Sequence, residues 1–74
     1  MDISETTQKT YRIDRRQIYF LRFILEGYDG MALIRTLDPE QGIVIVYIAP
    51  GCEDDVEMIL EDLSKEIMIK KERL

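Results

Sequence analysis

Residues 31–50, MALIRTLDPEQGIVIVYIAP, predict two strands joined by a tight turn, and this hairpin constrains the fold more than any other segment. Residues 43–49 are all apolar or aromatic and mostly β-branched, which is typical of a mid-sheet strand with both faces shielded from water. Residues 31–37 include an arginine and a threonine, which suit a strand nearer the edge. Between them, Pro39 presets the φ angle of a turn and Gly42 can adopt a positive φ. Other parts of the chain must therefore cover this hairpin.

The length of the chain limits how much surface it can bury. With 74 residues it forms one small domain, and a chain of this size buries only about 60 to 65% of its unfolded surface. A lone monomer is then marginally stable, and association with a second copy would help it. Residues 1–8 are polar and offer no face to bury, so we expect a flexible N-terminal tail there and a single α+β domain over residues 9–74.

The residue types argue against several classes of protein. There is no histidine and one cysteine, Cys52, so neither an internal disulfide nor the usual zinc patterns can form. No histidine can act as a base for Cys52, and no pair of acid-base groups is forced into a pocket, so we predict a non-catalytic protein without a cofactor or metal. The polar N-terminus lacks a signal peptide and the apolar run is too short for a bilayer, which predicts a cytoplasmic protein without a membrane partner.

The first half of the domain reads as a strand followed by a helix. Residues 9–13 alternate polar and apolar, as in a half-buried strand with Tyr11 and Ile13 facing the core. Asp14 followed three residues later by Gln17 is a capping-box pattern, which predicts that a helix begins there. On a helical wheel the expected core face consists of Ile18, Phe20, Leu21, Ile24 and Leu25.

Two features of this helix are candidates for function. Tyr19 and Phe23, four residues apart on its other side, form an aromatic pair that the core does not need. Phe23 is either a half-covered residue at the edge of the core or a partner contact. The glycines that follow predict a helix stop and a turn. The turn candidates are Glu26, Tyr28 and Asp29.

The last third of the chain supplies a second helix. Residues 52–67 carry apolar side chains on one narrow arc and three acidic residues at the start, where the helix dipole favours them. Residues 67–71 are either the frayed end of this helix or a short edge strand blunted by lysines. The order β-α-β-β-α, with a possible short last strand, predicts a ferredoxin-like two-layer sandwich: an antiparallel sheet with both helices on one face and the first and third strands central.

The stretch ILEGYDGMALIRTLDPEQGIVIVYIAP, followed by an acidic amphipathic helix, resembles a family of short bacterial proteins described only as a domain of unknown function. The likeness covers about residues 11–67, and EGYDG followed by RTLD carries it most specifically. This resemblance implies no activity. More loosely, the element order is similar to that of ACT domains, regulatory modules that bind amino acids and pair side by side. ACT domains have a glycine-containing ligand loop where this chain has Ile13-Asp14-Arg15-Arg16.

The pairing of the hairpin strands can also be predicted. We expect Leu37 to lie opposite Ile43, which fixes the partners of the remaining strand residues. Every second pair then faces the helices. The same register gives four further pairs: Arg35 with Ile45, Leu33 with Tyr47, Ile34 with Val46, and Ala32 with Ile48.

The face of the sheet away from the helices is therefore unusually apolar for a solvent-exposed surface, which usually marks an interface. We interpret the chain as a small binding or regulatory module that forms a homodimer through this face or the adjoining edge, with two arginines offered to a small acidic ligand or a protein partner. The candidate residues on this face are Arg12, Met31, Leu33, Arg35, Ile45 and Tyr47.

The alternative is an RNA-associated accessory protein, because RNA-recognition domains share this topology. It would use Arg12, Arg15, Arg16 and Arg35. The RNP motif is missing and the net charge is −5, so we expect no nucleic-acid binding. The two hypotheses differ in whether these arginines form one continuous patch.

Overall fold

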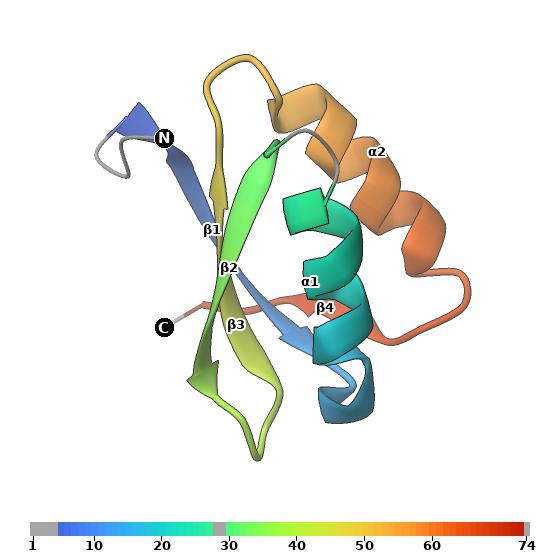
Figure 1. Cartoon of the computed structure of the whole chain (residues 1–74). Helices are drawn as coiled ribbons and strands as arrows, with labels where there is room; N and C mark the ends of the chain where they lie inside the picture. The colour runs from blue at the N-terminus through green and yellow to red at the C-terminus, as the bar shows by residue number, and fades with distance from the viewer. Residues whose placement is uncertain (1–4, 28–29, 74) are drawn as a thin grey trace.

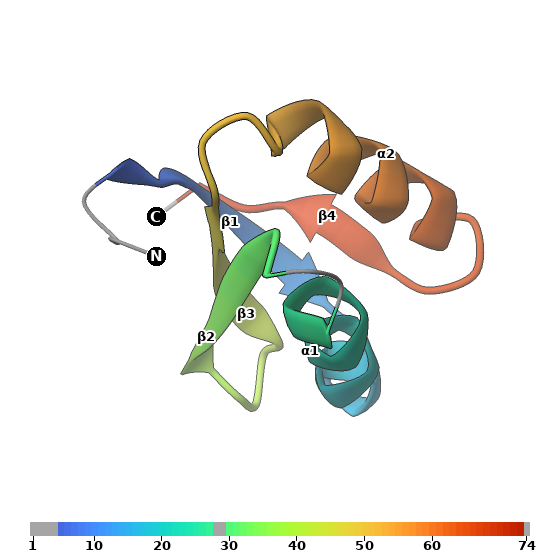
Figure 2. The ribbon, with the colours of Figure 1, turned by 45° about the horizontal axis from the view of Figure 1, so that its top comes forward.

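The computed structural model describes residues 5–27 and 30–73. It has two layers, a four-stranded sheet and two helices that lie on the same side of it (Figures 1 and 2). The short helix η2 precedes α1. In chain order the elements are β1 (Thr7–Ile13), η2 (Arg15–Gln17), α1 (Ile18–Gly27), β2 (Ala32–Asp38), β3 (Ile43–Ile48), α2 (Glu53–Leu63) and β4 (Ile69–Lys71).

The strand order in the sheet is β2-β3-β1-β4, and all neighbouring strands are antiparallel. The predicted α+β class, with both helices on one face of an antiparallel sheet, is confirmed, and the arrangement is compatible with a ferredoxin-like sandwich. β3 has a partner on each side, and Val44, Val46 and Ile48 are fully buried. The all-apolar strand therefore lies in the interior of the sheet, as its sequence predicted.

β1 begins at Thr7, two residues before the predicted start of the strand. Thr7 and Gln8, which the sequence placed in a flexible tail, pair with Ile48 and Tyr47 of β3. The Thr7 hydroxyl also donates to Glu53 at the start of α2, over 3.3 Å. Long-range pairing thus orders these two polar residues, although they have no apolar face of their own. Residues 1–4, also assigned to the tail, lie outside the described residues.

The register of the hairpin confirms the four predicted pairs at residues 32–35, but the predicted pair of Leu37 with Ile43 is wrong. Ile43 pairs with Asp38 instead, because a bulge between Thr36 and Asp38 leaves Leu37 as an extra residue. The Asp38 carboxylate accepts the backbone N–H groups of Glu40 and Gln41, at 3.0 and 3.1 Å. These bonds fix the turn at Asp38 rather than at Leu37.

The capping role of Asp14 is confirmed, since its carboxylate accepts the N–H of Arg16 at 3.0 Å. The turn that it caps is the 3-10 helix η2, and α1 begins only at Ile18. On α1, Leu21 and Leu25 are fully buried, whereas Phe20, predicted in the core, is 42% exposed. The helix buries only a narrow stripe of side chains along Leu21 and Leu25. Phe20 lies outside this stripe, because it is about 100° from Leu21 around the helix axis.

The predicted apolar arc of the second helix is confirmed, although α2 ends at Leu63. Residues 69–71 then form β4 beside β1, which decides between the two interpretations of this segment in favour of a short edge strand. The helices and the sheet share one buried cluster. Its members are Tyr11, Ile13, Leu21, Leu25, Ala32, Ile34, Val44, Val46, Ile48, Val56 and Leu60.

Candidate functional site on the open face of the sheet

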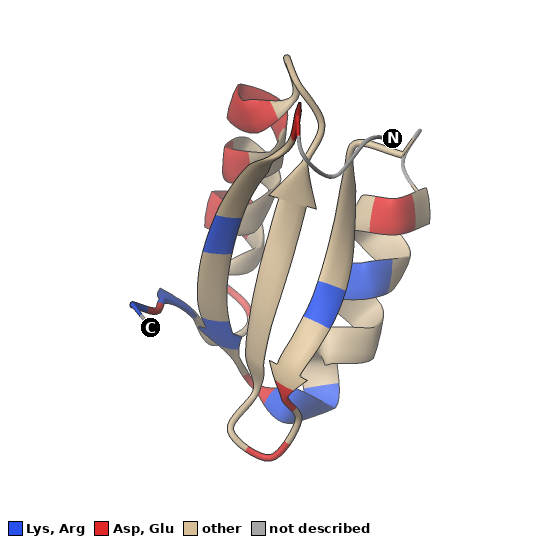
Figure 3. Ribbon diagram, turned by 90° about the vertical axis from the view of Figure 1, so that its left-hand side faces the viewer, with Lys and Arg blue, Asp and Glu red and all other residues tan. Residues whose placement is uncertain are grey.

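Both helices pack on one face of the sheet, and in the described part of the chain no helix covers the other (Figure 3). Directly opposite residues on neighbouring strands point to the same face. Leu33, Tyr47 and Gln8 therefore form one row across β2, β3 and β1, and Arg35, Ile45 and Thr10 form the next. We call this surface the open face. It consists of Gln8, Thr10, Arg12, Leu33, Arg35, Ile45 and Tyr47.

The apolar part of the open face lies on β2 and β3. Leu33 is 37% exposed, and Tyr47 and Ile45 are partly exposed. The three side chains adjoin, because Leu33 lies opposite Tyr47 and Ile45 is the next residue of β3 on the same face. Arg35 borders this group on the edge strand. Within the described residues its side chain makes no hydrogen bond or ion pair, so its positive charge is uncompensated.

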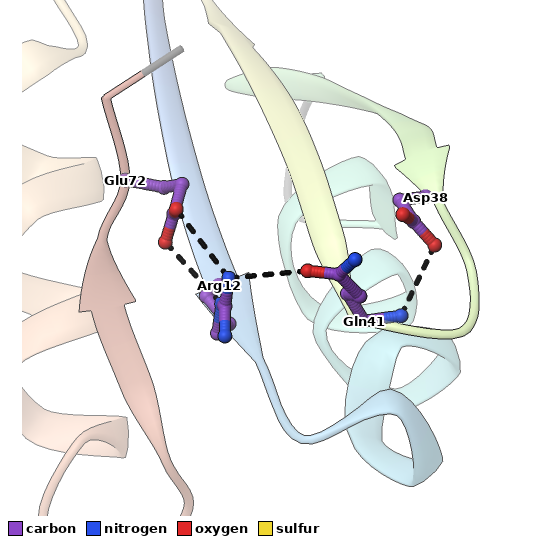
Figure 4. Close-up of polar contacts among 4 residues, drawn as sticks. All are labelled: Arg12, Asp38, Gln41 and Glu72. Carbon is purple, nitrogen blue, oxygen red and sulfur yellow. Dashed lines mark hydrogen bonds and ion pairs between the residues drawn. The ribbon is translucent and has the colours of Figure 1, made fainter.

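Arg12, the second predicted arginine, is already engaged (Figure 4). Its Nη2 donates to Gln41 Oε1 at 3.2 Å and lies 3.5 Å from Glu72 Oε1. Its Nε is 3.3 Å from Glu72 Oε2 but lacks hydrogen-bond geometry. Arg12 thus ties the segment after β4 to the hairpin turn, where Asp38 orders the backbone of Gln41. Of the two arginines proposed for a ligand, only Arg35 keeps an unpaired charge.

The remaining predicted residues lie elsewhere. Met31 precedes β2 and packs, partly buried, against the core. Tyr19 and Phe23 are 82% and 72% exposed on α1, in the helical layer, so the structure does not bring them to the open face. Glu26 belongs to α1 and not to the turn after it. The turn candidates Tyr28 and Asp29 lie outside the described residues.

The two edges of the sheet are less open than this face. At the β2 edge, Arg22 of α1 reaches the carbonyl oxygen of Ile34 and the hydroxyl of Thr36, both at 3.4 Å, and Glu26 binds the N–H of Ile34. The other edge strand, β4, has three residues, two of which are lysines. Short, charged or covered edges resist pairing with further strands. The sequence analysis did not predict that Arg22 and Glu26 cover the edge of β2. The only sequence feature that points to them is their i, i+4 spacing, which allows the two side chains to pair on the helix.

The four arginines of the RNA hypothesis lie on three different elements: Arg15 and Arg16 on η2, Arg12 on β1 and Arg35 on β2. Arg16 binds the Asp14 carboxylate through Nε and Nη2, at 3.2 and 3.0 Å, and these bonds hold the pKa of Asp14 below its usual value. Arg12 is paired with Glu72. Arg35 lies on β2, and β3, which has no charged residue, separates it from Arg12 on β1 (Figure 3).

The described residues contain no group of three histidine, cysteine, aspartate or glutamate side chains placed to hold a metal ion. They also contain no helix long and apolar enough to cross a bilayer. Cys52, the single cysteine, is partly buried just before α2.

The fold and this face define a small two-layer α+β protein whose sheet is covered by helices on only one side within residues 5–27 and 30–73. The model of a family described as a domain of unknown function, DUF4911, matches residues 11–67, and the chain belongs to this family. The resemblance predicted from EGYDG and RTLD is therefore confirmed, whereas the looser likeness to ACT domains stays a prediction. Neither the curated proteins nor the solved structures include a match to the chain.

Proposed function

We propose that this protein is a small non-catalytic binding or regulatory module that forms a homodimer through its open face. One observation carries the proposal. Leu33, Ile45 and Tyr47 form a contiguous apolar group on a sheet face that no helix of the described chain covers. Sheets that expose one face to water normally alternate apolar residues inward with polar residues outward, and β3 departs from that pattern.

Burial of this apolar surface against a second copy would be more favourable than its exposure to water. Two sheets can pack face to face about 10 Å apart, with their side chains interdigitated. A two-fold axis would bring the same patch of both copies together. Tyrosine and arginine are enriched at interfaces, and here Tyr47 lies beside the apolar centre while Arg35 lies at its border. Burial of this face would also supplement the small core.

The covered β2 edge and the short, lysine-bearing β4 edge favour face-to-face contact over edge-to-edge pairing. Glu26 and Arg22 occupy backbone groups in the middle of β2, so a second strand would first have to displace them. The unpaired charge of Arg35 is the feature best suited to a small acidic ligand or to an acidic group of a partner. The RNA alternative has less support, because Arg12 and Arg16 are already paired with carboxylates.

Light scattering coupled to gel filtration tests the dimer at micromolar protein concentrations. We expect the mass of a dimer for the wild type and of a monomer for Tyr47→Arg, which would place two charges in the interface. Tyr19→Arg is the matched control, because Tyr19 lies on α1 and is 82% exposed. It should leave the dimer intact. Circular dichroism confirms that both variants fold, and a wild type that stays monomeric at about 100 μM would overturn the proposal.

A further inference from the structure

The helical side of the molecule contains a pocket that the open face does not use. It has a volume of about 290 Å³ and lies between α2 and the β1–β4 pair. Leu60 of α2, Ile69 of β4 and the ring of Tyr11 supply its apolar lining. This volume is near the lower end of the range for small-molecule sites, which are largely apolar with a few convergent polar groups.

The Tyr11 hydroxyl is an unpartnered polar group at this pocket. Tyr11 is only 4% exposed and lines the pocket, and within the described residues its hydroxyl makes no hydrogen bond. The Tyr11 hydroxyl is nevertheless accessible to solvent. Among the described residues, the only solvent-inaccessible side-chain nitrogen or oxygen atom without a hydrogen bond is Arg12 Nε. Burial raises the pKa of Tyr11, so the hydroxyl is neutral and can donate or accept.

Two opposite charges on facing walls complete the pocket. Lys71 lies directly opposite Tyr11 in the β1–β4 register, so its ammonium and the Tyr11 hydroxyl are on the same face. Glu61 lies on the α2 wall. Neither charged side chain has an ion pair within the described residues. The other acidic group of this wall, Glu57, is already bound to Lys9, and the Ser64 hydroxyl donates to the Glu61 carbonyl at 2.6 Å.

We infer that this pocket binds a small dipolar molecule with an apolar middle. An anionic group at one end would bind Lys71 and Tyr11, a cationic group at the other end would bind Glu61, and the methylene chain between them would cover Leu60 and Ile69. Since the charges of the pocket come from different walls, those of the ligand must stand apart along its length. A molecule that carries both charges on one carbon should therefore fit this arrangement less well. This inference is independent of the dimer, because the pocket is on the opposite side of the sheet from the open face.

The probe is 6-aminohexanoate, followed by amide chemical shifts in ¹H–¹⁵N NMR spectra of the intact chain. We expect its addition to shift the amides of Tyr11, Lys71 and Glu61 in a saturable manner. Norleucine has the same atoms but holds both charges on one carbon, and hexanoate and hexylamine each lack one charge. All three should bind at least about fivefold more weakly.

Charge-reversal variants test which residue binds each end of the ligand. Lys71→Glu and Glu61→Lys should each weaken 6-aminohexanoate binding by at least about fivefold, and the double variant, with both charges reversed, should regain binding. Lys70→Glu is the matched control, because Lys70 is the register partner of Arg12 and points to the other face. The spectra also report whether each variant is folded.

Equal binding of norleucine would overturn the spacing argument. Equal binding of hexylamine or hexanoate would overturn the dipolar class, and an absence of saturable shifts at these residues would overturn the site. None of these results bears on the oligomeric state.

Discussion

The carboxylate of Glu26 accepts a hydrogen bond from the backbone N–H of Ile34 at 3.0 Å, and so joins the end of α1 to the outer edge of β2. Arg22, 3.8 Å from the same carboxylate, donates to the carbonyl oxygen of Ile34 at 3.4 Å. A helix side-chain pair thus satisfies both backbone groups of one edge residue, as a neighbouring strand would. Edge strands that lack such cover pair with other chains.

Removal of this contact should lower the stability of the fold. We expect Glu26→Ala to lower the free energy of unfolding by about 1 to 2 kcal/mol, because the N–H of Ile34 loses a charged acceptor. Urea denaturation measures this change. Glu26→Gln is the control, because its amide oxygen still accepts the bond, and it should lose less than half as much. Equal stability of wild type and Glu26→Ala would show that water replaces the carboxylate at no cost.

Local pattern was sufficient to predict most of the fold. The expected pair of Leu37 with Ile43 fixed the other four predicted pairs, and those four are correct although that pair itself is wrong. The register holds because the extra residue, Leu37, lies after Thr36 and leaves the pairing of residues 32–35 unchanged. The bulge at Leu37 was not predictable in this way. It depends on the Asp38 side chain, which binds two backbone N–H groups of the turn.

The candidate site was predicted less completely, because its polar contacts join distant segments. Leu33, Arg35, Ile45 and Tyr47 follow from the register and lie where the sequence placed them. Arg12 lies on the predicted face, but its pairing with Glu72, 60 residues away in the sequence, depends on the packing of β4 beside β1. Similarly, the i, i+4 spacing of Arg22 and Glu26 indicates a pair on the helix but not that Glu26 reaches the edge of β2. The dimer that the face suggests stays a prediction.

Gly42 is placed where a side chain cannot fit. Its φ is 73°, and a Cβ there would overlap the carbonyl oxygen of Ile13. The carbonyl of Gly42 accepts the Ile13 N–H at 2.8 Å, so the two backbones cannot separate without loss of that bond. We therefore expect Gly42→Ala to cost at least about 3 kcal/mol of unfolding free energy, from steric overlap added to left-handed strain.

Gly51→Ala is the matched control for Gly42. Gly51 has a φ of 88° but open space around it, so alanine there meets only the backbone penalty, about 1 to 2 kcal/mol. Thermal or urea unfolding compares the two variants. A cost for Gly42→Ala no larger than that for Gly51→Ala would contradict the close approach to Ile13.

Asp14 should titrate below an ordinary aspartate. Side-chain hydrogen bonds from Arg16, then its backbone N–H, hold the pKa of the Asp14 carboxyl below its usual 3.8. A carboxyl whose pKa is lowered on folding stabilises the protein above the unfolded pKa, and this stabilisation is lost as the pH falls through the folded pKa. Carbon-13 NMR titration of the carboxyl measures the shift. We expect Arg16→Ala to move the pKa back toward its usual value but not fully, because the backbone N–H remains. An unchanged pKa in Arg16→Ala would contradict the role of that side chain.

Tyr11 should make the protein sensitive to alkali. Burial raises the pKa of its phenol above the usual 10.0, because the phenolate would lose water at the pocket between α2 and β4. A group whose pKa is raised on folding contributes stability that is fully present below the unfolded pKa and is lost as the pH rises through the folded pKa. Thermal unfolding midpoints from about pH 8 to 11 should therefore fall more steeply in the wild type than in Tyr11→Phe.

The Tyr11→Phe variant also tests whether Tyr11 is the tyrosine with the raised pKa. The chain has four tyrosines, and absorbance titration near 295 nm should show that the variant lacks a phenol whose pKa is raised above 10.0 in the wild type. Tyr19→Phe is the control, because Tyr19 is 82% exposed, and the raised step should remain in this variant. If Tyr11→Phe keeps the raised step and the wild-type slope of stability against pH, the Tyr11 hydroxyl is hydrated in the folded protein, and the pocket then has no desolvated polar group to offer a ligand.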